Sequence, residues 1–344
     1  MARWKVAALA AVALMAFVSV AAPVHAQTKL RVADSFPTGH FVPKLTILAW
    51  MAEVTKRSNG AITFEYFPGQ QLGKAADMLT LTQTGVANIG YVAPSYISDK
   101  MPLSEAAMLP GSFQTSCQGT MGYWKAARGG AIEAQDFTAN KIRLLLAVTL
   151  TPYQILTVKN PIKNEADIRG LKLRSSGGAQ DLTLRTIGAV PVRMAAPDTY
   201  ESLSRGTMDG VLFPLDSALA YNLEKIVRYS TEGANFSSFV VTYSISEASW
   251  KELSPEFRKI MTDVAEEVVP AACAAIDGQE AEVRKKLEAA GVQFSPISAE
   301  FRSKLDDMLK DVGINWAKGL DSRGRKGSEA LAEFRKAVQA PSAK

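Results

Sequence analysis

The sequence predicts an α/β fold with a helical C-terminal third. Short apolar strand patterns alternate with helical patterns through most of the chain, and this order implies parallel strands joined by helical crossovers. Beyond Trp250 the pattern changes, and helical segments continue to Val338. A chain of 344 residues is long enough to bury a large core and suggests two lobes.

The first 26 residues have the pattern of a secretory signal peptide. Arg3 and Lys5 give a positive start, an apolar run reaches Val20, and cleavage is expected after Ala26. The apolar run is short for a membrane span, so we expect an exported mature chain without one. Removing the signal takes away two of the 39 basic residues and leaves a charge of about +3. Such a balanced, scattered charge does not indicate binding to nucleic acid or a membrane surface.

Histidine and cysteine are too scarce for most enzyme sites. His25 lies in the signal peptide, so His40 is the only imidazole of the mature chain and a multi-histidine zinc site is impossible. Cys117 and Cys273 lack the CxxC spacing of redox and zinc motifs, so no metal or other cofactor is expected. In an oxidising compartment the two cysteines could form a disulfide. We favour the alternative of two separate buried residues, because the sequence does not give their distance.

Each element of the predicted fold rests on a local pattern. Strands alternate or concentrate apolar residues and end at turn residues such as Pro68-Gly69, and Gly85 ends a helix over Asp77 to Thr84. Another helix follows the loop Asp34 to Gly39, and a long one is expected over Ser254 to Lys286. The expected strands in the first half are Lys29 to Ala33, Ile62 to Phe67, Val86 to Val92, Leu144 to Val148 and Ile155 to Lys159.

The most informative segment is Asp167 to Gly210. A short strand, Leu171 to Arg174, runs into the small residues of Ser175 to Gly178, and an amphipathic helix follows. This order places a ligand group at the carboxyl end of a strand in an open α/β sheet. Arg174 stands at that strand end, where a guanidinium can form two parallel hydrogen bonds with a carboxylate. The alternative is an arginine that pairs with a nearby Asp or Glu.

Several stretches resemble the DctP-like solute-binding subunits of TRAP (tripartite ATP-independent periplasmic) transporters. They are DIRGLKLR with GAVPV and YESLSRGTMDG (within Asp167 to Gly210), EVTKRSNGAITFEYFPGQQLG (Glu53 to Gly73), TLTQTGVANIG (Thr80 to Gly90) and WKELSPEFRKI (Trp250 to Ile260). The resemblance implies a two-lobed periplasmic solute-binding (clamshell) fold with crossing strands and a long helix that bridges the lobes. It assigns residues 27–150 and about 239–278 to one lobe, and 151–238 and about 279–344 to the other.

The resemblance also implies a function. Such proteins capture an organic acid in the periplasm and deliver it to the membrane permease subunits, and the arginine that holds the carboxylate falls on Arg174. Several positions that carry polar groups in the sugar-acid branch of the family differ here, and they read Gln154 beside Tyr153, Leu212 and Phe213 before Pro214, and Ala93 and Tyr96. These differences favour a carboxylate with an apolar or aromatic body over a polyhydroxy acid.

Arg174 and nine other residues are the candidate ligand-binding residues. The others are Phe36, His40, Tyr91, Tyr96, Tyr153, Gln154, Phe213, Phe236 and Phe239. Any of the aromatic residues could instead belong to the core, and His40 could cap the helix that follows it.

Two other functions would fit the same fold. A sensory subunit would present the same ligand to a membrane kinase. An exported enzyme would need a nucleophile and a base; Ser175 and Ser176 lie near Arg174, but no base is evident near them, so we expect no catalytic activity.

Overall fold

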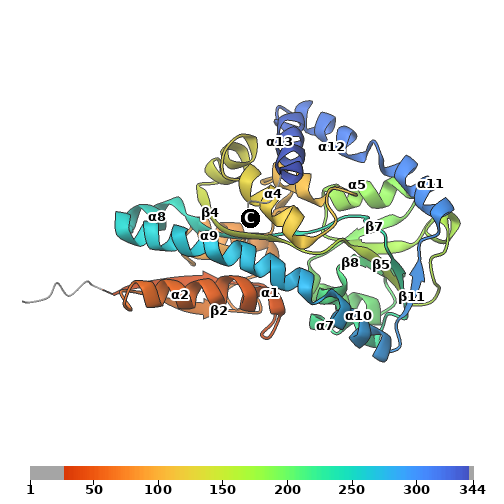
Figure 1. Cartoon of the computed structure of the whole chain (residues 1–344), viewed down its shortest axis with the longest axis horizontal. Coiled ribbons are helices and arrows are strands. Elements are labelled where there is room, and N and C mark those ends of the chain that lie inside the picture. Colours follow the sequence, from red (N-terminus) through yellow and green to blue (C-terminus); the bar gives the residue numbers. More distant parts are fainter. Residues whose placement is uncertain (1–26, 341–344) are drawn as a thin grey trace, which may run out of the picture.

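The computed structural model of the protein describes residues 27–340, which form two β-sheets with helices packed around them (Figure 1). Each sheet with its helices forms one lobe of an α/β structure, as the sequence predicts. The expected signal peptide, residues 1–26, lies outside the described residues. Within residues 27–340, no helix combines the length and the apolar character that crossing a membrane requires.

The first lobe contains a five-stranded sheet in the order β2-β1-β3-β10-β4. Strand β1 runs parallel to β2 and β3, whereas β10 runs antiparallel to both β3 and β4. The predicted strand Val86 to Val92 is shorter in the structure, because Val86 lies 41% exposed in the turn after Gly85. The strands are β1 (Thr28–Ala33), β2 (Ile62–Phe67), β3 (Ile89–Tyr91), β4 (Ile142–Thr149) and β10 (Val240–Ser246).

The second lobe contains a six-stranded sheet in the order β11-β9-β5-β8-β6-β7. Here β5 runs antiparallel to β8 and β9, so the expectation of parallel strands is wrong for β5 as it is for β10. Both exceptions follow a change of sheet: the chain passes from β4 to β5 and returns from β9 to β10. The strands are β5 (Gln154–Thr157), β6 (Lys172–Ser175), β7 (Val190–Arg193), β8 (Gly210–Phe213), β9 (Tyr229–Glu232) and β11 (Gln293–Pro296).

Helices cover both sheets. The predicted long helix over Ser254 to Lys286 is divided at Gln279, and its two parts, α9 and α10, pack against α2 and α7 respectively. The α-helices are α1 (Phe41–Pro43), α2 (Ala49–Arg57), α3 (Met78–Gln83), α4 (Ser116–Ala126), α5 (Ala179–Thr186), α6 (Thr199–Ser204), α7 (Leu215–Ala220), α8 (Glu247–Glu252), α9 (Pro255–Gly278), α10 (Glu280–Ala289), α11 (Ala299–Leu309), α12 (Val312–Asp321) and α13 (Gly327–Gln339). Shorter 3₁₀ or π segments used below are η3 (Pro94–Ile97), η4 (Leu103–Met108) and η5 (Glu133–Thr138).

The C-terminal helices contact both lobes. Helix α11 packs against α5 of the second lobe, whereas α13 packs against α4 and η4 of the first lobe (Figure 1). The family resemblance assigns residues 279–344 to the second lobe and does not anticipate that α13 contacts the first. That assignment stays a prediction.

A disulfide joins α4 to α9. Cys117 and Cys273 lie with their Cα atoms 4.7 Å apart and their sulfurs bonded, so the expectation of two separate buried residues is wrong. The two helices pack side by side although 156 residues separate the cysteines in sequence, which is why no local pattern indicated the bond.

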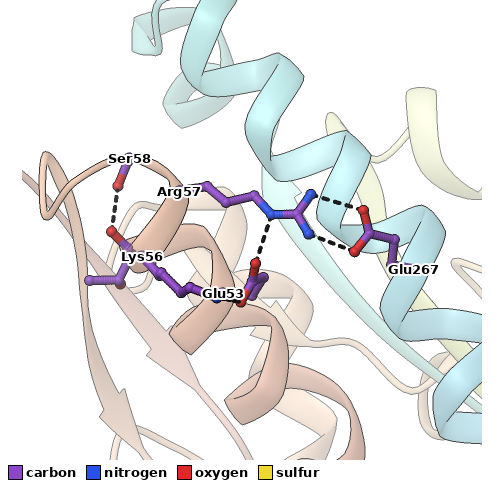
Figure 2. A network of polar contacts seen from close by, with 6 residues as sticks. Glu53, Lys56, Arg57, Ser58 and Glu267 are labelled. Carbon is purple, nitrogen blue, oxygen red and sulfur yellow. Dashed lines mark hydrogen bonds and ion pairs between the residues drawn. The ribbon is translucent and has the colours of Figure 1, made fainter.

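Polar contacts also fix α9 to the first lobe. Arg57 at the end of α2 donates two hydrogen bonds to Glu267 of α9, at 2.9 and 2.6 Å, and one to Glu53 at 2.8 Å (Figure 2). Beside them the indole of Trp50, fully buried, donates to the carbonyl oxygen of Met261 in α9 at 3.0 Å. The N-terminal half of α9 is therefore a firm part of the first lobe.

Candidate ligand-binding site

Arg174 lies at the carboxyl end of β6, where the sequence placed it. Its side chain is almost fully buried, with 1% of the residue exposed. Nε donates to the carbonyl oxygen of Met194 at 3.1 Å. Within residues 27–340, Nη1 has no hydrogen-bond partner and no Asp or Glu carboxylate lies within 4.0 Å of the guanidinium. Arg174 therefore does not form the local ion pair that was the alternative, and its positive charge is available to an anion.

Seven aromatic side chains lie around one cavity with Arg174. They line a cavity with Arg174, and its other lining residues are aliphatic or small; the full set is Phe36, Tyr91, Tyr96, Leu150, Tyr153, Arg174, Ala196, Phe213, Ser217, Tyr221 and Phe239. The cavity measures about 10 Å³ for the centre of a water molecule, which is room for about one water. A ligand the size of an organic acid therefore requires the lobes or the side chains to move apart.

The cavity lies between the two lobes. Tyr91 comes from β3 of the first lobe and Tyr96 from η3 beside it, whereas Phe213 ends β8 of the second lobe. The Arg174 guanidinium lies 5.1 Å from the centre of the Phe213 ring, close enough for a cation–π interaction. Tyr221 meets the same ring edge-on at 5.8 Å. Closing the lobes therefore surrounds one positive charge with rings from both sides.

The tyrosine residues of the cavity are hydrogen-bond donors in addition to the Arg174 guanidinium. Burial raises the pKa of Tyr91, Tyr153 and Tyr221 well above the ordinary value, and for Tyr153 and Tyr221 it outweighs the opposite effect of the Arg174 charge. These phenols therefore keep their protons at neutral pH. The Tyr96 oxygen accepts a hydrogen bond from the amide of Ala196 at 3.0 Å, so its own proton points elsewhere. Guanidinium and phenol donors together suit an anionic oxygen ligand.

Seven of the ten predicted site residues meet in this cavity: Phe36, Tyr91, Tyr96, Tyr153, Arg174, Phe213 and Phe239. His40 lies in the layer behind, with its ring 4.3 Å from that of Phe36. Its Nδ1 accepts from the amide of Val42 at 3.2 Å, so it caps the short helix α1, which was the alternative role. Burial lowers the pKa of His40 to about 3, so the ring is neutral at neutral pH.

Two predicted residues lie elsewhere. The Gln154 amide donates to the carbonyl oxygen of Ala234 at 2.6 Å and accepts from Thr231 at 2.9 Å, so it holds the loop after β9 in place. Phe236 is fully buried and lines a separate groove beside α11 and α12. Neither residue lines the cavity that contains Arg174.

The prediction missed four residues of the cavity: Leu150, Ala196, Ser217 and Tyr221. Tyr221 is the most important of them, because it lines both the cavity and an outer groove of about 530 Å³ that also borders both lobes. A signal was present, since Tyr221 follows the six-residue helix that begins two residues after Phe213. Among the two serines considered as nucleophiles, Ser175 donates to Asp181, and neither lines the cavity.

The fold is a two-lobed α/β structure with a small cavity between the lobes, lined by Arg174 and aromatic residues. The family described as bacterial extracellular solute-binding protein, family 7 (DctP) matches residues 34–318, and the chain belongs to this family. The resemblance found in the sequence is thereby confirmed. The family consists of solute-binding proteins, which are non-enzymatic components of transport systems.

Solved structures and sequence relatives agree with this assignment. A TRAP periplasmic solute-binding protein from Bordetella bronchiseptica with bound mandelate is 25% identical, with a TM-score of 0.82 over 91% of this chain and 99% of that one. A TRAP solute-binding protein from Rhodoferax ferrireducens in complex with benzoate is 23% identical, with a TM-score of 0.84 over 91% and 98%. The C4-dicarboxylate-binding periplasmic protein DctP of Rhodobacter capsulatus is 24% identical over 93% of this chain and 92% of its own length.

Proposed function

We propose that this protein captures a small carboxylate with an aromatic or apolar body in the periplasm and delivers it to the membrane permease of a TRAP transporter. The observation that carries the proposal is the buried Arg174 guanidinium, which lacks a carboxylate partner within residues 27–340 and lies among seven aromatic rings. A ligand carboxylate supplies the missing countercharge. A buried charge without a partner is unfavourable, so the ligand that neutralises it binds with a large gain.

The binding mode follows from the arrangement of donors. The carboxylate forms two parallel hydrogen bonds with the guanidinium, because Nε is already held by Met194 and fixes the plane of the group. Phenol hydroxyls of Tyr96 and its neighbours donate to the remaining lone pairs. The body of the ligand stacks between Phe213 and the rings of the first lobe, and each such aromatic pair contributes about 0.5–1.5 kcal/mol beyond the area it buries.

Family membership alone does not select the ligand, since relatives are named for C4-dicarboxylates and structures of the same fold hold mandelate or benzoate. The residues that line the cavity of this chain favour an aromatic acid over a sugar acid. A sugar acid would place several hydroxyls against Phe36, Phe213 and Phe239, and each unpaired hydroxyl costs about 1–3 kcal/mol. An aromatic acid has no such cost.

A thermal-shift screen of the mature protein tests the ligand class. Benzoate and mandelate should raise the melting temperature, because they bind only the folded state, and galacturonate should not. Isothermal titration calorimetry of the hits gives their affinities, and Arg185→Ala, which removes an exposed arginine of α5, is the matched control for Arg174. A screen in which galacturonate alone stabilises the protein would reject the aromatic preference.

Transport and export need separate tests. In cells that express the cognate permease, uptake of the radiolabelled acid should require this protein with Arg174 intact. Protein recovered from the periplasmic fraction should begin at Gln27. Long incubation with the acid should return it unchanged, whereas excess product over protein would mean that the protein is an enzyme.

A further inference from the structure

Two side chains cross between the lobes at the turn that follows Arg174. From the first lobe, Glu105 of η4 accepts a hydrogen bond from the amide of Ala179, the first residue of α5, at 2.8 Å. From the second lobe, Arg193 at the end of β7 donates to the carbonyl oxygens of Ser95 and Tyr96, both at 3.1 Å. A carboxylate and a guanidinium thus cross in opposite directions beside the ligand cavity.

The two glycines of this turn are explained by these crossing side chains. A Cβ atom on Gly178 would lie 2.0 Å from both carboxylate oxygens of Glu105, and one on Gly177 would lie 2.5 Å from Nε of Arg193. Both glycines also have a positive φ, 110° at Gly177 and 52° at Gly178, and residues with a Cβ atom disfavour this conformation. The Gly177-Gly178 pair therefore gives both interlobe side chains room to reach the backbone that carries Arg174.

Glu105 is an unusual cap for a helix. The residue is 2% exposed, and within residues 27–340 its second carboxylate oxygen, Oε1, has no hydrogen-bond partner. Burial raises the pKa of Glu105 to about 7, and the nearby carboxylate of Asp136 in η5 acts in the same direction. The Ser98 side chain, the Ala179 amide and the positive charge of Arg193 act in the opposite direction. Tyr123 of α4, which packs against η4, donates to Ser104.

We propose that Glu105 is a positioning residue for ligand capture: together with Arg193 it holds the lobes closed over Arg174, and closure takes up a proton at its carboxyl group. The proposal rests on the proposed function in so far as closure captures the ligand. A protonated carboxyl still accepts from the Ala179 amide through its carbonyl oxygen, and it no longer carries a buried negative charge.

The pH dependence follows from linkage. When the lobes separate, Glu105 meets water and the pKa of its carboxyl falls towards the ordinary value. The closed state therefore binds more protons than the open state between that value and about 7, and its advantage is lost as the pH rises through 7. Ligand affinity should accordingly be higher at pH 6 than at pH 8.

The test compares Glu105→Gln and Glu105→Ala with the parent, using benzoate as the probe because it stays ionised over this pH range. Glu252→Gln, at an exposed glutamate of α8, is the control variant. We expect the benzoate Kd of the parent and of the control to rise severalfold, up to about tenfold, from pH 6 to pH 8. Glu105→Gln keeps the hydrogen bond without the charge, so its Kd should be the same at both pH values and no higher than that of the parent at pH 6. Glu105→Ala leaves the Ala179 amide unpaired and should bind about fivefold more weakly at pH 6.

Two results would overturn the proposal: a Glu105→Gln variant with the pH profile of the parent, or a Glu105→Ala variant that binds like the parent at pH 6. If benzoate and other carboxylates do not bind the parent at all, the proposed function fails. The contact between Glu105 and the Ala179 amide is then tested without ligand. Hydrogen exchange of the Ala179 amide, measured in the ligand-free protein, should then be faster in Glu105→Ala than in the parent. Equal exchange rates would show that Glu105 does not hold the lobes together, whatever the ligand is.

Discussion

Replacing Arg174 by methionine should abolish binding and at the same time stabilise the ligand-free protein. Methionine fills a similar volume but carries no charge, so Arg174→Met separates the two roles of the residue. In the structure, where the two lobes are in contact, the guanidinium is 1% exposed and, within residues 27–340, has one hydrogen bond to the protein, from Nε to Met194. A buried charge with so few partners destabilises the fold, and it is available to pair with a ligand carboxylate.

The two effects have different magnitudes. Loss of the guanidinium leaves a ligand carboxylate buried and unpaired, which costs about 2–5 kcal/mol or roughly thirty- to several-thousandfold in affinity. Removal of a buried, incompletely paired charged group stabilises the fold by about 1–3 kcal/mol, reduced by the lost cation–π contact with Phe213. For a chain of this size, each kcal/mol corresponds to a rise in melting temperature of about 2–4 °C.

The assay is a melting curve and a calorimetric titration with the same acid on three proteins: the parent, Arg174→Met and Arg174→Lys. The lysine variant keeps the charge but cannot form two parallel hydrogen bonds, so it should recover only part of the affinity and none of the stability. If Arg174→Met binds the acid as tightly as the parent, Arg174 is not the anchor. If the variant binds weakly but melts below the parent, the argument about the buried charge is wrong.

Two further predictions concern stability. Replacing Cys117 and Cys273 together by alanine should lower the free energy of unfolding by about 2–5 kcal/mol, because the bond closes a long loop, while the affinity for ligand stays within about twofold; urea denaturation and titration measure both. Burial raises the pKa of Asp34 to about 6 and that of Asp136 to about 7, so the folded state holds protons that the unfolded state has released, and their contribution to stability is lost as the pH rises from about 4 to 7. Denaturation at several pH values should show a shallower fall over this window for Asp136→Asn, and an unchanged slope would contradict the assignment.

The elements that the sequence predicted are those whose pattern is local. The strand Ile62 to Phe67 is β2 of the structure, and the strand before Arg174 differs from β6 by one residue at each end. The reversed directions of β5 and β10 could not be predicted, because alternation of apolar residues is the same in parallel and antiparallel strands. β10 is buried on both faces along its whole length, so its pattern also lacks the alternation that marks a strand.

The site divides in the same way. Arg174 was predicted because a strand end and a glycine turn are adjacent in sequence, and the aromatic residues that line its cavity were predicted mainly from the family resemblance. An amide at a strand end can serve a neighbouring loop as well as a ligand, and the hydrogen bonds of Gln154 to Ala234 and Thr231 could not be read from the sequence. Glu105 had no local signal at all. Its role depends on a contact with a helix 74 residues away.

Three of the contacts that join the lobes lie near the end of β6, beside the Arg174 charge. Tyr96 accepts from Ala196, Arg193 reaches the carbonyl oxygens of η3, and Glu105 caps α5. Each contact removes a polar group from water, so closure without ligand gains little and leaves the Arg174 charge enclosed as well. A ligand carboxylate neutralises that charge only when the rings of the first lobe arrive. The preference for the closed state therefore comes from the ligand, and the interlobe contacts determine how tightly it is then held.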